Sequence, residues 1–192
     1  MQNNREYLPR VAYWLVPRHP HREKLKTLIG ALAERFSAPV FVPHVTVYSC
    51  RRSAQQQELA AMAALASQFA AVTLCPTGLA SQDNLSQALF LKLREESSIR
   101  GLCQSLHAAV AHPSGYELAP HVSLLYQMLP VRVREELVRE TSIPLPNILF
   151  DELWAVAIPG QLRQQGDFGG WQPLLICRLA SGLIDGTIET SR

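Results

Sequence analysis

Two nearly identical tetrapeptides, Pro43-His44-Val45-Thr46 and Pro120-His121-Val122-Ser123, constrain this 192-residue chain more than any other feature. Each lies in an apolar run that is typical of a strand. Because side chains alternate across a strand, the histidine and the hydroxyl residue of each motif should share one face. If the two strands face each other, two imidazoles and two hydroxyls surround one site. Such a set of donors and acceptors suits a bound phosphate.

Strands and helices alternate along the whole chain. Apolar and β-branched runs predict the strands, and apolar residues spaced three and four apart predict the helices. Each motif follows a long predicted helix, and the first half is predicted to end near residue 93. This order predicts an internally duplicated α+β protein. The predicted strands are 10–17, 40–49, 71–77, 87–93, 118–126, 149–158 and 173–179, and the predicted helices are 20–36, 54–69, 95–111 and 131–141.

Length and composition are typical of a globular protein with a real core, since 47% of the residues are hydrophobic and 18% are charged. We expect one bilobal domain over residues 1–180 and a loose tail over 181–192. The formal net charge is only +2, which favours a small anionic ligand or a nucleic-acid end over a long duplex. The first residues lack the apolar core of a signal peptide, and no apolar run could span a bilayer. A cytoplasmic location and no membrane partner are therefore expected.

Two histidines and two hydroxyls are sufficient for the hydrolysis of a phosphodiester. The reaction needs a base for water, an acid for the leaving oxygen, and donors for the charged non-bridging oxygens. With an ordinary pKa of about 6.5, one imidazole can be neutral while the other is protonated near neutral pH. We therefore expect neither a metal nor a cofactor. Metal-ligand spacing is missing among the remaining histidines and the four cysteines, which are His19, His21, His107, His112, Cys50, Cys75, Cys103 and Cys177.

A structural role must be weighed against this function. A single histidine in an apolar strand is more often a core or edge residue than a catalyst. An ordinary core, however, gives no reason to repeat Pro-His-Val-hydroxyl in both halves, so the repeat favours a functional site. A nucleotide-binding module without catalysis could also keep such a pocket. Two titratable imidazoles argue against that alternative, because binding alone does not need both.

At these residues the chain resembles the two-histidine (2H) phosphoesterase superfamily, whose signature is a His-x-Thr/Ser motif on each of two facing strands. The closer resemblance is to its cyclic phosphodiesterases, and it rests on three stretches: VAYWLVP at 11–17, FVPHVTV at 41–47 and PHVSLLY at 120–126. The resemblance implies an α+β fold with two pseudo-symmetric lobes. Each lobe would be an antiparallel sheet with helices on its outer face, and the motifs would face each other across a central cleft.

The resemblance also implies an activity, the metal-independent opening of a cyclic phosphodiester. The substrate would be a nucleoside 2′,3′-cyclic phosphate, giving the 2′-phosphate, or ADP-ribose 1″,2″-cyclic phosphate, giving ADP-ribose 1″-phosphate. By the same analogy His121 activates water and His44 protonates the leaving oxygen, although exchanged roles correspond to attack from the other side. Thr46 and Ser123 would hold the phosphate.

An RNA-end enzyme of the same superfamily is the main alternative. It would be a 2′-5′ RNA ligase or phosphodiesterase, or a 3′ exonuclease, and RNA 3′ ends would be its partners. The chain lacks a pronounced basic stripe for tracking RNA, which favours a small cyclic phosphate as the substrate. The protein is expected to act as a monomer.

Three aromatic residues near the motifs are secondary candidates. Trp14 lies where the family carries an aromatic near the cleft, and it could stack on a base or ribose or simply pack in the core. Tyr126 follows His121 by five positions, so in a regular strand it lies on the opposite face and needs a bulge or a strand end to reach substrate. Tyr48 is four positions from His44 and should share its face, without a family role.

Overall fold

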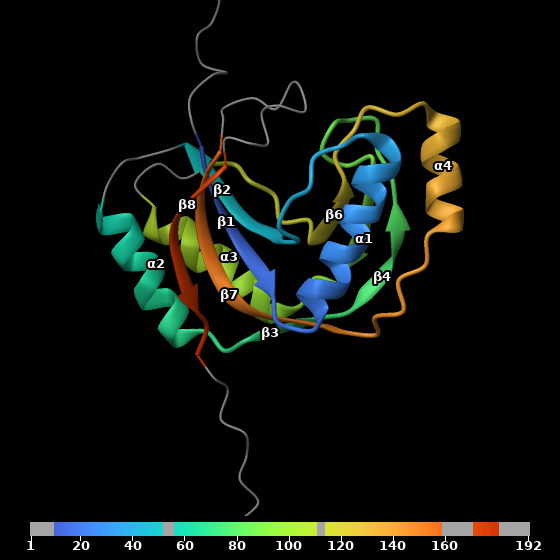
Figure 1. Cartoon of the computed structure of the whole chain (residues 1–192). Coiled ribbons are helices and arrows are strands. Elements are labelled where there is room, and N and C mark those ends of the chain that lie inside the picture. Colours follow the sequence, from blue (N-terminus) through green and yellow to red (C-terminus); the bar gives the residue numbers. More distant parts are fainter. Residues whose placement is uncertain (1–9, 52–55, 111–113, 159–170, 181–192) are drawn as a thin grey trace, which may run out of the picture.

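Two antiparallel sheets and the helices beside them make up the computed structural model, which describes residues 10–51, 56–110, 114–158 and 171–180 (Figure 1). The strands are β1 Arg10–Pro17, β2 Val45–Arg51, β3 Val72–Leu74, β4 Pro76–Ala80, β5 Leu89–Leu93, β6 His121–Leu125, β7 Ile148–Ile158 and β8 Gln172–Arg178. The helices are α1 His21–Phe36, α2 Gln56–Gln68, α3 Ser97–Ala109 and α4 Val131–Glu140. The α+β class predicted from the element order is confirmed.

The larger sheet has the order β2-β1-β7-β3, and β8 also pairs with β7, beyond the end of β3. The smaller sheet has the order β4-β5-β6, and every pairing in both sheets is antiparallel. In the described part of the chain the element order β-α-β-α-β-β occurs twice, from β1 to β4 and from β5 to β8. The internal duplication predicted from the two motifs is therefore present in the element order.

Each repeat places one of its later strands beside a strand of the other repeat. β4 of the first repeat pairs with β5 of the second, and β7 of the second repeat pairs with β1 of the first. The prediction that the first half ends near residue 93 is therefore wrong, because β5 begins the second repeat. The single strand predicted over 71–77 is also wrong. The chain leaves the larger sheet at Cys75, whose carbonyl accepts a hydrogen bond of 2.8 Å from the backbone N–H of Arg94.

Helices from both repeats cover each sheet. α1 packs against β6 of the smaller sheet and α4 lies beside β5, whereas α3 packs against β2 of the larger sheet and α2 lies against α3, β7 and β8 (Figure 1). α1 buries Leu25, Ile29 and Leu32, whose spacing of three and four places them on one face. Each lobe thus depends on elements of both repeats for its core.

Both motif strands begin later than predicted. The prediction gave 40–49 and 118–126, but β2 begins at Val45 and β6 begins at His121. Pro43 and Pro120 stand just before these strands. A proline has no N–H to donate to a ladder and its φ is fixed, so each motif histidine lies at a strand entrance. The predicted loop over 160–170 and tail over 181–192 lie outside the described residues.

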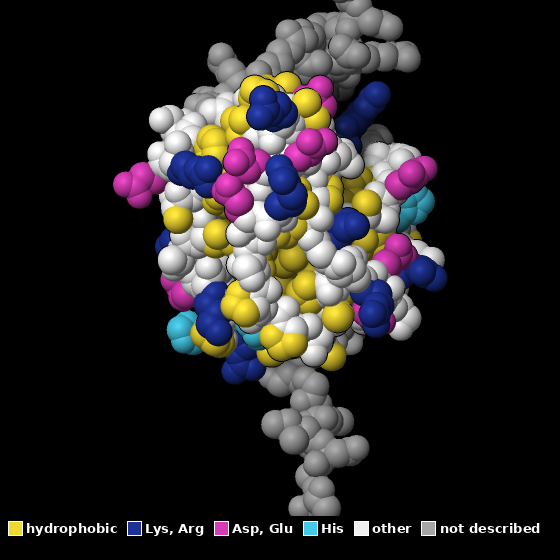
Figure 2. All heavy atoms as spheres, turned by 90° about the vertical axis from the view of Figure 1, so that its right-hand side faces the viewer, with side chains coloured by type: hydrophobic (Ala, Val, Ile, Leu, Met, Phe, Trp, Pro, Cys, Tyr) yellow, Lys and Arg dark blue, Asp and Glu magenta, His cyan; other side chains and the backbone are white. Residues whose placement is uncertain are grey.

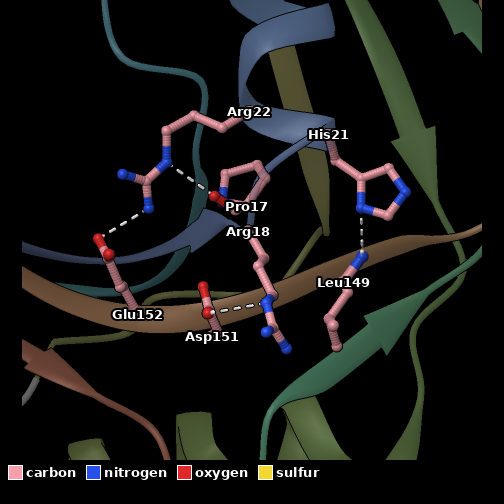
Figure 3. A network of polar contacts seen from close by, with 7 residues as sticks. All are labelled: Pro17, Arg18, His21, Arg22, Leu149, Asp151 and Glu152. Atoms are coloured by element: carbon pink, nitrogen blue, oxygen red, sulfur yellow. Dashed lines mark hydrogen bonds and ion pairs between the residues drawn. The ribbon is translucent and has the colours of Figure 1, made fainter.

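A polar network fixes the connection from β1 to α1 on β7 (Figure 3). The Arg22 guanidinium donates to the carbonyl of Pro17 at 2.7 Å and pairs with Glu152 at 2.8 Å. Arg18 pairs with Asp151 at 3.7 Å, and the backbone N–H of Leu149 donates to Nδ1 of His21 at 3.3 Å. The start of α1 is thereby attached to the larger sheet, although the helix packs on the smaller one. Within the described residues, no helix is long and apolar enough to cross a membrane.

Candidate active site

The two motif histidines line one cavity between the sheets, with a volume of about 270 Å³. Both imidazoles are held in the same way. Nδ1–H of His44 donates to the carbonyl of Val42 at 2.7 Å, and Nδ1–H of His121 donates to the carbonyl of Ala119 at 2.7 Å. Because a carbonyl only accepts, these bonds place the proton on Nδ1 and leave each Nε2 for chemistry. The two motifs therefore meet in one cavity, as predicted.

A β-bulge follows each motif, one residue past its hydroxyl. Trp14 pairs with Thr46 and Tyr13 with Tyr48, so Val47 has no partner in the β1–β2 ladder. Phe90 pairs with Ser123 and Leu89 with Leu125, so Leu124 has none in the β5–β6 ladder. An extra residue shifts the alternation of faces by one. The residue five positions past each histidine therefore turns toward the cavity.

The bulge in β6 decides the position of Tyr126. A regular strand would point this side chain away from His121, but the structure places it in the cavity lining, just beyond the end of β6. Ser49 holds the equivalent place after the first motif and also lines the cavity. Burial raises the pKa of the Tyr126 hydroxyl well above its usual range, although a hydrogen bond with the Ser123 side chain opposes that shift.

Tyr48 does not share the face of His44, contrary to the prediction from a regular strand. The same bulge places it opposite Tyr13, on the core side of the larger sheet, with 1% of its surface exposed. Its hydroxyl oxygen accepts a hydrogen bond of 2.7 Å from the backbone N–H of Ser114. Tyr48 is a core residue that connects β2 to the segment before β6.

Aromatic rings enclose His44. The indole of Trp14 stacks on its imidazole, with 3.7 Å between ring centroids and 13° between planes. Trp171 meets the same imidazole edge-on at 5.8 Å and also contacts Trp14 and Tyr126. Phe41 stacks on Tyr126 at 3.9 Å. Trp14 thus lies in the cavity lining, one face of its indole is covered by His44, and only 4% of its surface is exposed.

The surroundings of His44 keep it neutral in the free protein. Its side chain is nearly covered, and this burial lowers its pKa to about 4. The hydrogen bond to Val42 opposes the shift, and the positive charge of a protonated His121 adds to it. The second effect places the two imidazoles within electrostatic reach of each other. His121 differs in being only half-buried at the mouth of β6.

The two motif hydroxyls are placed alike but bonded differently. Thr46 and Ser123 both line the cavity. The Ser123 hydroxyl donates to the carbonyl of Ser86 at 2.8 Å, so its proton is in use. Ser86 belongs to the connection between β4 and β5, which forms part of the cavity wall. The identical spacing in the sequence does not reveal this difference.

Several cavity residues were not predicted. They lie outside the two motifs and are Ala12, Ser49, Ser86, Gln87, Tyr116, Ile158 and Trp171. The Tyr116 hydroxyl donates to the carbonyl of Thr46 at 2.9 Å, and burial raises its pKa to about 12. None of these residues belongs to a recognisable sequence motif. Ser49 alone could have been indicated, because a bulge after the motif turns the fifth residue past the histidine toward the cavity. Among the described residues, no group of three or more His, Cys, Asp or Glu could hold a metal ion.

Known proteins with this architecture support the grouping suggested by the motifs. The family model described as cyclic phosphodiesterase-like protein matches residues 10–113. The fold is similar to Escherichia coli LigT complexed with 3′-AMP, with a TM-score of 0.58, 16% identity, and coverage of 88% of this chain and 97% of that one. It is also similar to TT0787 of Thermus thermophilus, with a TM-score of 0.56, 18% identity, and coverage of 90% and 99%.

The remaining comparisons agree with this result. Escherichia coli LigT complexed with ATP gives a TM-score of 0.56 at 18% identity, covering 91% of this chain and 99% of that one. Such low identities show a shared fold. No match is found among curated protein sequences. The family match covers more than half of the chain and includes the first motif, and the second motif completes the paired signature in space. The chain therefore belongs to the cyclic phosphodiesterase-like family of the two-histidine phosphoesterases.

Proposed function

We propose that this protein hydrolyses a small cyclic phosphodiester by acid and base catalysis from two histidines, without a metal. The substrate is a nucleoside 2′,3′-cyclic phosphate, giving the 2′-phosphate, or ADP-ribose 1″,2″-cyclic phosphate, giving the 1″-phosphate. The observation that carries the proposal is the pair of imidazoles in one cavity, each with Nδ1–H bonded to a backbone carbonyl and Nε2 left for chemistry. This arrangement supplies a proton acceptor and a proton donor on two sides of one phosphate.

In the reaction His121 gains a proton from water and His44 gives a proton to the leaving oxygen. The water oxygen bonds to phosphorus while Nε2 of His121 accepts a water proton. The bond from phosphorus to O3′ breaks as Nε2–H of His44 gives its proton to O3′. The product is the 2′-phosphomonoester, and exchange of protons with solvent resets both imidazoles. Thr46 supplies a hydroxyl donor for a non-bridging oxygen, because its side chain lies in the cavity lining.

His44 must acquire a proton before it can act as the acid, since burial keeps it neutral in the free protein. A bound phosphodiester brings a negative charge against the imidazole and favours its charged form. The parallel indole of Trp14 favours the charged form as well, through its electron-rich face. Substrate binding and protonation of His44 are therefore coupled in this mechanism.

The dimensions and charge of the molecule support a small substrate. The cavity of about 270 Å³ can hold a cyclic phosphate and part of its ribose. Figure 2 shows that Lys and Arg side chains alternate with Asp and Glu on the face of the molecule that carries α4. That face has no continuous basic stripe for an RNA backbone. Escherichia coli LigT, which shares the fold, has been crystallised with 3′-AMP and with ATP.

The test is hydrolysis of nucleoside 2′,3′-cyclic phosphate in the presence of a chelator, by the wild type and by His44→Ala and His121→Ala. Each variant should lose all measurable turnover, because the acid and the base each contribute about 10²-fold to 10⁴-fold and act together. His107→Ala, on the exposed side of α3, is the matched control and should keep wild-type activity. Undiminished activity in either site variant would refute the two-histidine mechanism.

A substrate panel separates the small-molecule activity from the RNA-end alternative. It contains nucleoside 2′,3′-cyclic phosphates, ADP-ribose 1″,2″-cyclic phosphate and an RNA that ends in a cyclic phosphate, with 2′ and 3′ products resolved. Comparable or higher kcat/KM for the small substrates, with 2′ products, is the expected result. A kcat/KM that is at least 100-fold higher for the RNA would replace the proposal with RNA-end processing.

A further inference from the structure

The hydroxyl that the second motif offers to a phosphate is already used within the protein. A non-bridging oxygen on the side of His121 would be expected to meet the hydroxyl of Ser123, as the motif suggests. The Ser123 proton, however, is directed to the carbonyl of Ser86 at 2.8 Å. Its side chain is also hydrogen-bonded to Tyr126. In the structure Ser123 therefore supports the wall of the cavity.

The side chain of Gln87 offers a donor on the same side. It lines the same cavity, and its Nε2 lies 3.2 Å from Nε2 of His121. Gln87 lies near the end of the connection between β4 and β5, where its backbone N–H donates to the carbonyl of Asn84 at 3.4 Å. A group this close to the reactive nitrogen of His121 is also close to any phosphate oxygen that approaches that nitrogen.

Hydrogen bonds fix which end of the Gln87 amide faces His121. The backbone N–H of Ser86 donates to Oδ1 of Asn84 at 3.1 Å, and a backbone N–H can only donate. The Asn84 amide therefore presents its NH2 group, which donates to Oε1 of Gln87 at 2.9 Å. The NH2 group of Gln87 is then the end that faces His121.

The same chain of bonds defines the protonation of His121 in this arrangement. Its Nδ1–H donates to Ala119, and its Nε2 accepts from Gln87, so Nε2 carries no proton. Lys92, which pairs with His121 in the β5–β6 ladder, is a charged residue beside this imidazole, whereas His44 across the cavity is neutral in the free protein. Gln87 thus contacts the nitrogen that acts as the general base in the proposed mechanism.

We propose that Gln87 is a catalytic residue of the cyclic phosphodiesterase site, and that its side-chain amide, oriented by Asn84, donates to a non-bridging phosphate oxygen of the bound substrate. This inference rests on the proposed function. In the free protein the amide N–H occupies Nε2 of His121. When substrate binds, the N–H moves to the phosphate oxygen and releases the Nε2 lone pair to the attacking water. The amide keeps both protons throughout, so the proton balance of the reaction is unchanged.

The kinetic test compares Gln87→Ala with the wild type on nucleoside 2′,3′-cyclic phosphate. The loss of one transition-state donor should lower kcat by about 100-fold. Gln87→Asn, which is polar but one methylene shorter, should be impaired in the same direction. Asn84→Asp keeps the acceptor for Ser86 but removes the donor to Gln87, so it should lower kcat by a smaller factor. Gln104→Ala, on the exposed side of α3, is the control and should be unchanged.

A second measurement reports on the hydrogen bond without turnover. Imidazole NMR of His121 in the free protein should show a titration midpoint at higher pH in Gln87→Ala, because the donor that favours unprotonated Nε2 is gone. Gln87→Glu has the same shape and a negative charge, so it should move the midpoint further in the same direction. A folding defect would not rank the midpoints of the wild type, Gln87→Ala and Gln87→Glu in this order. The amide NMR spectrum of each variant is compared with that of the wild type to check that the variant is folded.

The two measurements separate failure of this inference from failure of the proposed function. A wild type that hydrolyses cyclic phosphates, with Gln87→Ala at wild-type kcat or an unchanged His121 titration, overturns the role of Gln87 alone. A wild type without that activity overturns the proposed function. In that case the binding of inorganic phosphate tests the role of Gln87. Weaker phosphate binding by Gln87→Ala, together with a shifted His121 titration, would support Gln87 as a phosphate donor. Equal binding by the variant and the wild type would reject that role.

Discussion

At the scale of residues, the two histidines have the same backbone hydrogen bond and different surroundings. His44 is covered by Trp14 and Trp171, whereas His121 is half-buried and hydrogen-bonded to Gln87. Removal from water penalises a charged imidazole in the first position, whereas the Gln87 amide lies 3.2 Å from Nε2 in the second. The two motif imidazoles therefore differ through neighbours that lie outside the motifs.

The burial of His44 makes stability depend on pH. Its pKa is about 4 in the folded protein and about 6.5 in the unfolded chain. Between these values only the unfolded state binds the proton, so the stabilisation is complete above pH 6.5 and is lost as the pH falls toward 4. The loss should be about 3 kcal/mol.

Urea unfolding at pH 7 and pH 4.5 measures this effect. The wild type should lose more free energy of unfolding over that range than His44→Gln, in which the imidazole is absent and other titrating groups are unchanged. Equal losses in the two proteins would show that His44 titrates normally in the folded state.

At the scale of elements, the bulges after each motif decide which side chains reach the cavity. They place Ser49 and Tyr126 toward the site and Tyr48 in the core. The segments that carry the site are attached to distant elements. Tyr116 bonds to β2, and the start of α1 is tied to β7 through Arg22 and Glu152 (Figure 3). Strand irregularity and long-range polar contacts thus act together to shape the cavity.

The connection between β1, α1 and β7 should depend on Glu152. Its carboxylate accepts from Arg22 at 2.8 Å and from Nε1 of Trp154 at 2.8 Å, and the pair is mostly buried. Glu152→Ala leaves both donors without this acceptor and should lower the free energy of unfolding by about 1–3 kcal/mol. Glu152→Gln, which keeps one acceptor oxygen, should lose less.

Urea unfolding checks this prediction, with Glu140→Ala as the matched control. Glu140 pairs with Arg35 at 3.2 Å on the surface, so its removal should cost no more than about 0.5 kcal/mol. A cost for Glu152→Ala as small as that of Glu140→Ala would mean that the network in Figure 3 contributes little to stability.

At the scale of the whole molecule, the lobes cannot be separated by one cut in the chain. β7 comes from the second repeat and lies between β1 and the edge strands of the larger sheet, whereas β4 comes from the first repeat and completes the smaller sheet. The helices are exchanged as well, because α1 packs on β6 and α3 packs on β2. The cavity therefore forms only when both repeats have folded together.

A fragment of residues 1–110 should not fold alone, even though it contains most of the family match. It would lack β7, which buries Phe150, Leu153 and Ala155 in the core, and it would lack β6 beneath α1. Circular dichroism and amide NMR of this fragment should show a largely unfolded chain. Cooperative unfolding and dispersed amide signals in the fragment would instead show that the first repeat is an independent unit.

Much of the fold and the core of the site could be predicted from sequence because their signals are local. The strand at 10–17 and the helices α1 and α4 follow from apolar periodicity, and they were placed within a residue or two. His44, Thr46, His121 and Ser123 were found because their spacing repeats. Gln87, Tyr116 and Trp171 could not be found, because they reach the cavity through tertiary contacts that leave no pattern in the chain.

The pattern of residues alone predicts that two strands each present a histidine and a hydroxyl, since the period of a strand is a local property of the backbone. Which strands are partners follows from the folded molecule, because pairing joins segments far apart and is governed by total burial rather than by local pattern. The tertiary structure also placed the bulges, covered His44 and directed the proton of Ser123 to Ser86. Two motifs of nearly the same sequence thereby became two unequal halves of one site.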